Sequence, residues 1–168
     1  ISGAHLNPAV TFAVAITGRI TPKLAGLYVV TQLLAAVVAA LAVKFLLPTM
    51  AAQAVGYGIP RISSEMTLTG AIWLEAVLTF FLVSAVFGTA ISPHAPKVGG
   101  FGIGLVLVFD ILVGGPLTGA AMNPARAFGP AVVANDWHGH AAYWIGPLVG
   151  ALAAAVLWGK VLLPRDGE

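Results

Sequence analysis

Ile1-Ser2-Gly3-Ala4-His5-Leu6-Asn7-Pro8-Ala9-Val10-Thr11-Phe12 opens the chain, and its central triplet Asn7-Pro8-Ala9 returns as Asn123-Pro124-Ala125. Asn is a favoured helix N-cap and Pro suits the first helical position, so each triplet predicts the start of a helix. The apolar runs that follow, 9–17 and 125–133, would each be about 14 Å long at ~1.5 Å per residue. Because a bilayer has a hydrocarbon core of ~30 Å, both runs are predicted to be half-helices.

The two triplets belong to an internal repeat of 116 positions. A shift by 116 aligns Gly3 with Gly119 and Phe12 with Phe128, and it continues without a gap to Pro48 and Pro164. Each copy therefore combines a half-helix, a loop and a spanning helix. The repeat also predicts two further helices, about fifty residues in all, upstream of residue 1. We therefore expect an N-terminally truncated chain that does not conduct unaided.

The composition is that of a membrane protein. Hydrophobic residues make up 59% of the chain and charged residues 8%, with a mean hydropathy of +0.96, whereas soluble domains carry about 25% charge. Cysteine is absent, which excludes disulfides and thiolate metal sites, and the histidines lack ligand spacing, so no metal or cofactor is expected. We expect no nucleic-acid binding, because there is no basic cluster, and no enzymatic activity, because no nucleophile–base set is present.

The expected fold is an all-α membrane protein with four transmembrane helices and two re-entrant half-helices. The apolar runs predict spans at 24–47, 68–91, 99–114 and 141–163. A single domain covers 1–168, with the remainder of the first repeat at 1–48, a surface loop at 49–67 and the second repeat at 68–164. The bias of cations in short loops places the loop after the first half-helix in the cytoplasm. The half-helices then enter from opposite sides, as an inverted repeat that meets near the midplane.

This geometry predicts a lumen for neutral solutes. Irregular backbone at membrane depth is tolerated only where it is buried or lines a wet cavity, so the loop carbonyls should form a file of acceptors. Two helix N-termini supply positive potential, and the amides of Asn7 and Asn123 supply donors, so cations and hydronium should be opposed. The residues expected to present pore carbonyls are Gly3, Ala4, His5, Gly119, Ala121 and Met122.

The stretches Ser2-Gly3-Ala4-His5-Leu6-Asn7-Pro8-Ala9 and Gly119-Ala120-Ala121-Met122-Asn123-Pro124-Ala125-Arg126 resemble the two signature loops of the aquaporin (major intrinsic protein) family. The resemblance covers the whole chain. It implies a channel of six helices plus two half-helices, usually a homotetramer in the lipid bilayer with one pore in each subunit. We expect a passive channel for water, in a multi-pass protein of the plasma (inner) membrane from a prokaryotic source.

The resemblance also places a selectivity filter at Arg126, Ala120 and Ile111. Water-selective members commonly have His where this chain has Ile111, and Ile111 resembles the plant tonoplast type. A wider and less polar gate leaves ammonia, urea, hydrogen peroxide or glycerol possible. Ala127, where glycerol channels have Asp, and the aromatic pair Tyr143-Trp144 argue for water.

Two acidic residues lie inside predicted spans. Glu75 resembles the family's buried glutamate that accepts N–H groups of the re-entrant loop, together with Gln32, which makes both architectural. Asp110 precedes the filter position Ile111 by one residue, or about 100° around the helix, so we expect it to face a neighbouring helix. The ring of His5 is expected to pack within its loop.

Three readings compete with a water channel. Within the family, the chain could be a glycerol, urea or ammonia facilitator. Outside it, secondary transporters also use inverted repeats and broken helices, but they need a coupling site, and neither Glu75 nor Asp110 adjoins a triplet. A purely structural junction protein on the same fold is the third reading.

Overall fold

The computed structural model describes residues 3–98 and 100–163, and over these residues every regular element is a helix. Within these described residues, four helical segments are long and apolar enough to cross a membrane: Pro22–Leu46, Leu68–Ile91, Gly100–Thr118 and Ala142–Leu162. Ser2, the predicted span start Gly99 and the tail 164–168 lie outside this part of the chain. The elements are α1 (Pro8–Ile16), α2 (Pro22–Leu46), α3 (Thr49–Ala54), η1 (Gly56–Gly58), α4 (Leu68–Val86), η2 (Phe87–Ile91), α5 (Gly100–Thr118), α6 (Pro124–Ala134), α7 (Ala142–Leu157) and η3 (Trp158–Leu162).

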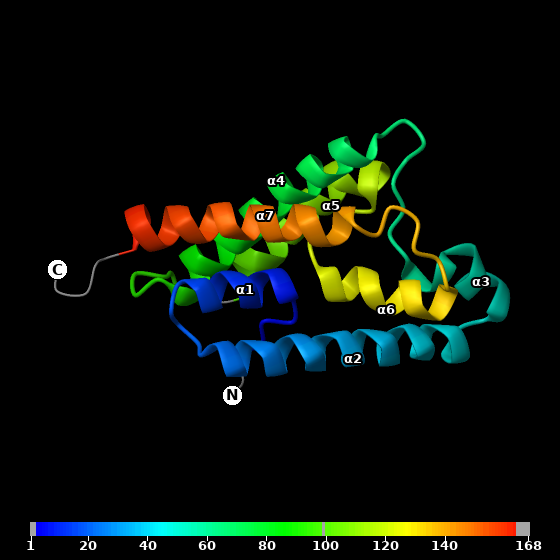
Figure 1. Ribbon diagram of the computed structural model, residues 1–168, viewed down its shortest axis with the longest axis horizontal. Helices are drawn as coiled ribbons and strands as arrows, with labels where there is room; N and C mark the ends of the chain where they lie inside the picture. Colours follow the sequence, from blue (N-terminus) through cyan, green and yellow to red (C-terminus); the bar gives the residue numbers. More distant parts are fainter. Residues whose placement is uncertain (1–2, 99, 164–168) are drawn as a thin grey trace.

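The two half-helices, α1 and α6, lie end to end with their N-termini meeting at the middle of the molecule (Figure 1). The Asn7 side chain accepts from the N–H of Ala9, and the Asn123 side chain accepts from the N–H groups of Ala125 and Arg126. These bonds satisfy helix-terminal donors that would otherwise need other partners. The N-caps expected from the two triplets are therefore present.

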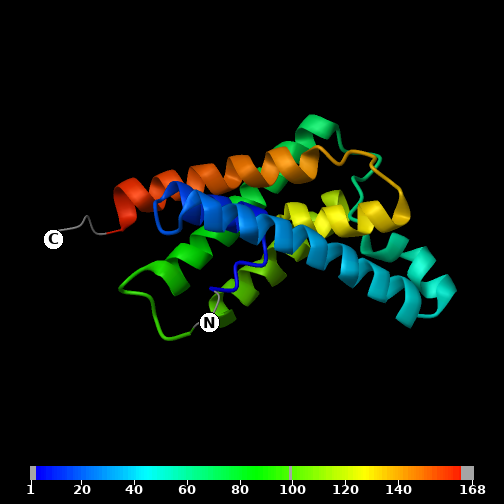
Figure 2. The same ribbon diagram turned by 60° about the horizontal axis from the view of Figure 1, so that its bottom comes forward.

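The spanning helices enclose the half-helices from two sides. Helix α2 runs along one side of α1 and α6, and α4, α5 and α7 lie on the other (Figures 1 and 2). Gly150 lets α7 approach α4 closely, since a Cβ added there would meet the carbonyl oxygen of Ala76. Gly129 has the same role where α6 meets Ala36 of α2. Small residues at such contacts are typical of helix packing in membranes.

The segment expected as a surface loop, 49–67, contains the short helix α3 and the turn η1. This helix was not predicted, because the loop was inferred from glycines and prolines, which within this segment begin only at Gly56. The preceding residues 49–54 include good helix formers such as Met50 and Gln53, and Ala52 is fully buried.

Helix α5 continues to Thr118, beyond the predicted end near Gly114. Pro116 does not stop it, although it provides no N–H for the helix. The last turn is held by other contacts: Thr118 donates to Glu75 of α4, and the N–H that follows the helix still bonds to the carbonyl of Gly115. The predicted helix end near Gly114 was wrong, because it was inferred from Gly115 and Pro116 alone and these tertiary contacts cannot be seen in the local sequence.

Candidate functional site

The two re-entrant loops have nearly the same backbone. In the first, Gly3, Ala4 and Leu6 have φ values of 79°, 45° and 54°. In the second, Gly119, Ala120 and Met122 have φ values of 81°, 43° and 50°. Left-handed φ at Ala, Leu or Met costs of order 1–3 kcal/mol per residue and persists only where surrounding contacts impose it. Equivalent positions of the two repeats therefore share the same strained backbone conformation.

The two loops are joined at their tips by a reciprocal pair of hydrogen bonds. Asn7 Nδ2 donates to the carbonyl of Met122 at 2.8 Å, and Asn123 Nδ2 donates to the carbonyl of Leu6 at 3.0 Å. Each Asn thus uses Oδ1 to cap its own half-helix and one Nδ2 hydrogen to hold the opposite loop. Because an amide carries two such hydrogens, one on each side chain is left for a further acceptor.

Leu6 belongs to the first loop, whose carbonyls were expected to face the lumen, but it was not among the six residues predicted to present pore carbonyls. Its carbonyl is the repeat equivalent of the Met122 carbonyl, since both residues precede the Asn of a triplet. The internal repeat was the signal that could have found it, because Met122 was predicted to present its carbonyl to the pore.

Glu75 anchors the second loop. Its carboxylate is fully buried and accepts from Thr118 Oγ1 at 2.7 Å, from the N–H of Ala121 at 2.9 Å and from the N–H of Met122 at 2.6 Å. Tyr143 of α7 donates its hydroxyl to the Thr118 carbonyl at 2.8 Å. Because a buried carboxylate is costly unless it is hydrogen-bonded, these three donors account for its presence in a span.

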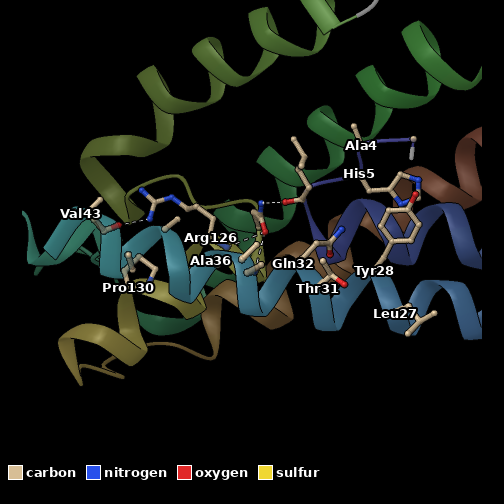
Figure 3. A pocket seen from close by; sticks show the side chains of 18 of the residues that line it. Ala4, His5, Leu27, Tyr28, Thr31, Gln32, Ala36, Val43, Arg126 and Pro130 are labelled. Carbon is tan, nitrogen blue, oxygen red and sulfur yellow. Dashed lines mark hydrogen bonds between the residues drawn. The ribbon is translucent and has the colours of Figure 1, made fainter. Parts of the chain in front are cut away.

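Gln32 belongs to a separate network in the first repeat. Its Nε2 donates to Thr11 Oγ1 at 3.0 Å, and Thr11 also pairs with His5 Nδ1 at 3.1 Å. Gln32 was predicted to act together with Glu75, but its hydrogen bond is with Thr11 of α1. The His5 ring stacks on Tyr28 of α2, with centroids 4.5 Å apart (Figure 3). It also lies beside Gly3 of its own loop, where an added Cβ would be 3.4 Å from His5 Nε2.

Arg126 projects from the first turn of α6 toward α2, on the Val43 side of the groove (Figure 3). Its Nη1 donates to the carbonyl of Gly58 at 2.6 Å. This bond uses one of the five guanidinium N–H groups. Nothing in the sequence pointed to Gly58, because a backbone acceptor in a loop has no residue-type signature.

Two hollows meet at the loop tips. A cavity of about 370 Å³ is lined by both asparagines and by all three predicted filter positions: Asn7, Asn123, Ile111, Ala120 and Arg126. A groove of about 1210 Å³ runs along α2 and also reaches Asn123 and Arg126. The predicted carbonyl residues Gly3, Ala4 and His5 line both hollows, and Ala121 and Met122 line the smaller one.

Some of the predicted site residues are buried next to the loop tips. Pro8, Ala9, Pro124 and Ala125 are buried at the helix starts. Gly119 packs closely against Pro60, since an added Cβ would lie 2.9 Å from the Pro60 Cβ. Gly119 is not among the lining residues of either hollow, and its carbonyl at the pore stays a prediction.

Asp110 is fully buried on α5, and neither carboxyl oxygen has a hydrogen-bond partner within residues 3–98 and 100–163. Ile103, Leu107 and Ile111 form the face of α5 that lines the smaller cavity, and Asp110 lies about 100° from Ile111 around the helix. The same ranges hold no group of three His, Cys, Asp or Glu residues placed to bind a metal ion.

An aromatic cluster closes the turn before α7. His140 contacts the rings of Trp137, Phe128 and Tyr143, and its Nε2 accepts from Trp144 Nε1 at 3.0 Å. Burial lowers the pKa of His140 below its ordinary value of 6.5. The ring is therefore neutral at pH 7 and can accept this bond.

Comparisons with known proteins give a consistent result. Residues 1–158 match the model of the family described as "Major intrinsic protein". The chain is 42% identical over 171 residues to Aquaporin TIP4-4 of Zea mays and 39% identical over 168 residues to Aquaporin TIP2-1 of Arabidopsis thaliana. These matches cover 100% and 97% of this chain, but only 66% and 64% of the two relatives.

Among solved structures, an aquaglyceroporin from Plasmodium falciparum has the same fold, with a TM-score of 0.81. The match covers 95% of this chain and 73% of that one at 23% sequence identity.

Proposed function

Because the chain belongs to the major intrinsic protein family, whose members are integral membrane channels, we propose that the protein is a passive channel for water that also admits small neutral solutes. The family match confirms the resemblance inferred from the paired triplets. The relatives named above are plant proteins. A prokaryotic source, N-terminal truncation and a plasma-membrane location stay predictions.

The observation that carries the proposal is the reciprocal pairing of Asn7 and Asn123 with the opposite loops beside a cavity. The pairing holds both amides in place, and each retains one N–H for a solute oxygen. A water molecule that accepts from these groups must point its own hydrogens away from the junction. Proton relay is then interrupted, because that water cannot donate toward the asparagines.

Charge selectivity follows from the same junction. The N-termini of α1 and α6 meet there, and each contributes roughly half a positive charge. Arg126 adds a full charge at the same cavity. Cations are opposed by both, whereas a neutral hydrogen-bonding solute is not.

The filter composition supports a second solute class beside water. Ile111 is 51% exposed and lines the smaller cavity together with Ala120 and Arg126. We therefore propose a filter of these three residues that is wider than one containing His. Ammonia, urea, hydrogen peroxide or glycerol could then pass with water.

Proteoliposomes with the protein expressed from its complete gene test the proposal. Osmotic shrinkage should be fast without any imposed ion or proton gradient, and a trapped pH dye should show no proton leak. Arg126→Val should raise glycerol and cation permeability relative to water. Gradient-dependent flux would instead indicate a transporter, and the absence of flux a structural protein.

We also propose that the protein is a homotetramer. Apolar side chains cover the exposed face of α5, including Phe101, Leu105, Phe109 and Leu112, and such a surface is suited to contact with lipid or with another copy of the chain. Light scattering in detergent should give the mass of four protomers, and a monomer mass would contradict this assignment.

A further inference from the structure

The segment 55–63, which leads from α3 toward α4, contains the carbonyl that accepts a hydrogen bond from Arg126. Its turn η1 places Gly56, Tyr57 and Gly58 in succession at φ values of 53°, 56° and 90°. Tyr57 is the informative residue, because left-handed backbone is unfavourable for a bulky side chain and must be imposed by contacts. The carbonyl that accepts from Arg126 belongs to the next residue, Gly58.

The downstream end of this segment is tied to the last turn of α5 and to the second re-entrant loop. The Ser63 N–H donates to the Leu117 carbonyl at 2.8 Å. Pro60 packs against Gly119 so closely that an added Cβ there would lie 3.0 Å from the Pro60 Cα. These contacts involve backbone atoms of the segment, so this end has little freedom to shift relative to α5 and the second loop.

The upstream end is held by a side chain of α2. Lys44 Nζ lies 5.7 Å from the centroid of the Tyr57 ring and 5.9 Å from that of Phe45. A cation at this distance from an aromatic face is attracted by the negative charge of the ring face. Lys44 lies in the last turn of α2, so this contact fastens the turn η1 to the end of a spanning helix.

We propose that Lys44 and Tyr57 are positioning residues for Arg126 and so help to set the solute selectivity of the filter. The contact between the ammonium and the ring keeps Tyr57 in its left-handed conformation, which directs the Gly58 carbonyl toward the guanidinium. Without the contact the turn relaxes, the Gly58 carbonyl withdraws, and Arg126 becomes free to move within the groove. This inference rests on the proposed role of Arg126 as a filter residue.

Substitutions can separate the ring from the backbone conformation. Tyr57→Asn removes the ring but keeps a residue that tolerates left-handed backbone, whereas Tyr57→Phe keeps the ring and serves as the matched control. Lys44→Met removes the charge and keeps an unbranched apolar side chain of similar length, with Lys44→Arg as its control. All four are made with Arg126 present and again in an Arg126→Val background.

The measurement is the ratio of glycerol to water permeability in proteoliposomes, which a loss of folded protein alone does not change. Tyr57→Asn and Lys44→Met should each raise the ratio by about two- to fivefold, the change that a cation–π contact of ordinary strength corresponds to. Arg126→Val should raise it in the same direction. The Phe and Arg controls should keep the native ratio, and none of the four should change it further once Arg126 is absent.

The outcomes distinguish this inference from the proposed function. An unchanged ratio in Tyr57→Asn and Lys44→Met, with a raised ratio in Arg126→Val, would overturn the inference and leave the filter intact. An unchanged ratio in Arg126→Val would overturn the filter assignment itself. A rise of equal size with and without Arg126 would show that Lys44 and Tyr57 act by another route, which also overturns the inference. If Tyr57→Asn does not fold, the Lys44 pair decides alone.

Discussion

Replacing Glu75 with Gln tests the account of the second re-entrant loop. The carboxylate accepts three hydrogen bonds in a fully buried site, two at Oε1 and one at Oε2. Gln keeps the shape but offers one acceptor oxygen, and its NH₂ group must face at least one of the donors. In the best orientation the amide oxygen still accepts from the Thr118 hydroxyl and the Ala121 N–H, and the NH₂ group faces the N–H of Met122.

The magnitude follows from these three bonds. Leaving the buried N–H of Met122 without an acceptor costs about 1–3 kcal/mol. The two remaining bonds change from a charged acceptor to a neutral one, which removes about 1 kcal/mol each. The expected loss is therefore about 3–5 kcal/mol, a large part of a typical stability of ~5–15 kcal/mol. Because the Met122 carbonyl holds Asn7, water permeability per folded molecule should fall as well.

Thermal unfolding and SDS titration in detergent micelles measure the loss of stability, with Asp110→Asn as the matched control. Both substitutions replace a fully buried carboxyl group by an amide. The Asp110 carboxyl makes no hydrogen bond within the described ranges, so its replacement should change the stability by less than about 1 kcal/mol. The reasoning is refuted if Glu75→Gln is as stable as the native protein, or if Asp110→Asn costs as much.

Three further predictions concern packing, selectivity and pH. Gly150→Ala should destabilise the protein by roughly 1–3 kcal/mol in the same unfolding assay, because the new Cβ would meet the Ala76 carbonyl. Gly26→Ala, where a Cβ meets open space, should be neutral or stabilising by up to about 1 kcal/mol, and equal effects would contradict the packing argument. Ile111→His should lower glycerol and ammonia permeability relative to water in proteoliposomes, and an unchanged ratio would remove Ile111 from the filter. The pKa of His140 is lowered by burial from 6.5, so the unfolded chain binds this proton more tightly, and stability should fall as the pH drops through about 6.5 and below. His140→Gln should flatten part of that pH profile, and a slope unchanged by the substitution would exclude His140 as a source.

The sequence predicted the architecture well because its strongest signals were local and repeated. The caps at Asn7 and Asn123 follow from residue preference alone, and the spans follow from long apolar runs. The meeting of the two half-helices followed from the repeat. Two equivalent units inserted in opposite directions form an inverted repeat, and their half-helices then meet near the midplane. Asn7 and Asn123 lie 115 and 117 positions from their cross-loop acceptors, and they could be placed together for this reason.

The parts that the sequence did not predict depend on backbone groups and on tertiary contacts. The carbonyls of Gly58 and Leu6 are acceptors in the structure, but any residue type carries a carbonyl. Helix α5 passes Pro116 because Thr118 is held from another helix, which a local rule for helix ends does not include. Gln32 was assigned to the Glu75 network because both are polar residues in apolar helices, and only the structure separates their partners.

The hydrogen bond from Asn7 to the Met122 carbonyl also sets an order of events during synthesis. Its two residues are 115 positions apart, and a ribosome that adds roughly 5–20 residues per second needs on the order of 6–23 seconds to make that length of chain. During this interval the first half-helix is already made, while the loop that must receive its amide has not yet left the ribosome. For that interval the Asn7 amide lacks its acceptor on the second loop, so this hydrogen bond, and the meeting of the two half-helices that it holds, can form only after Met122 has been made.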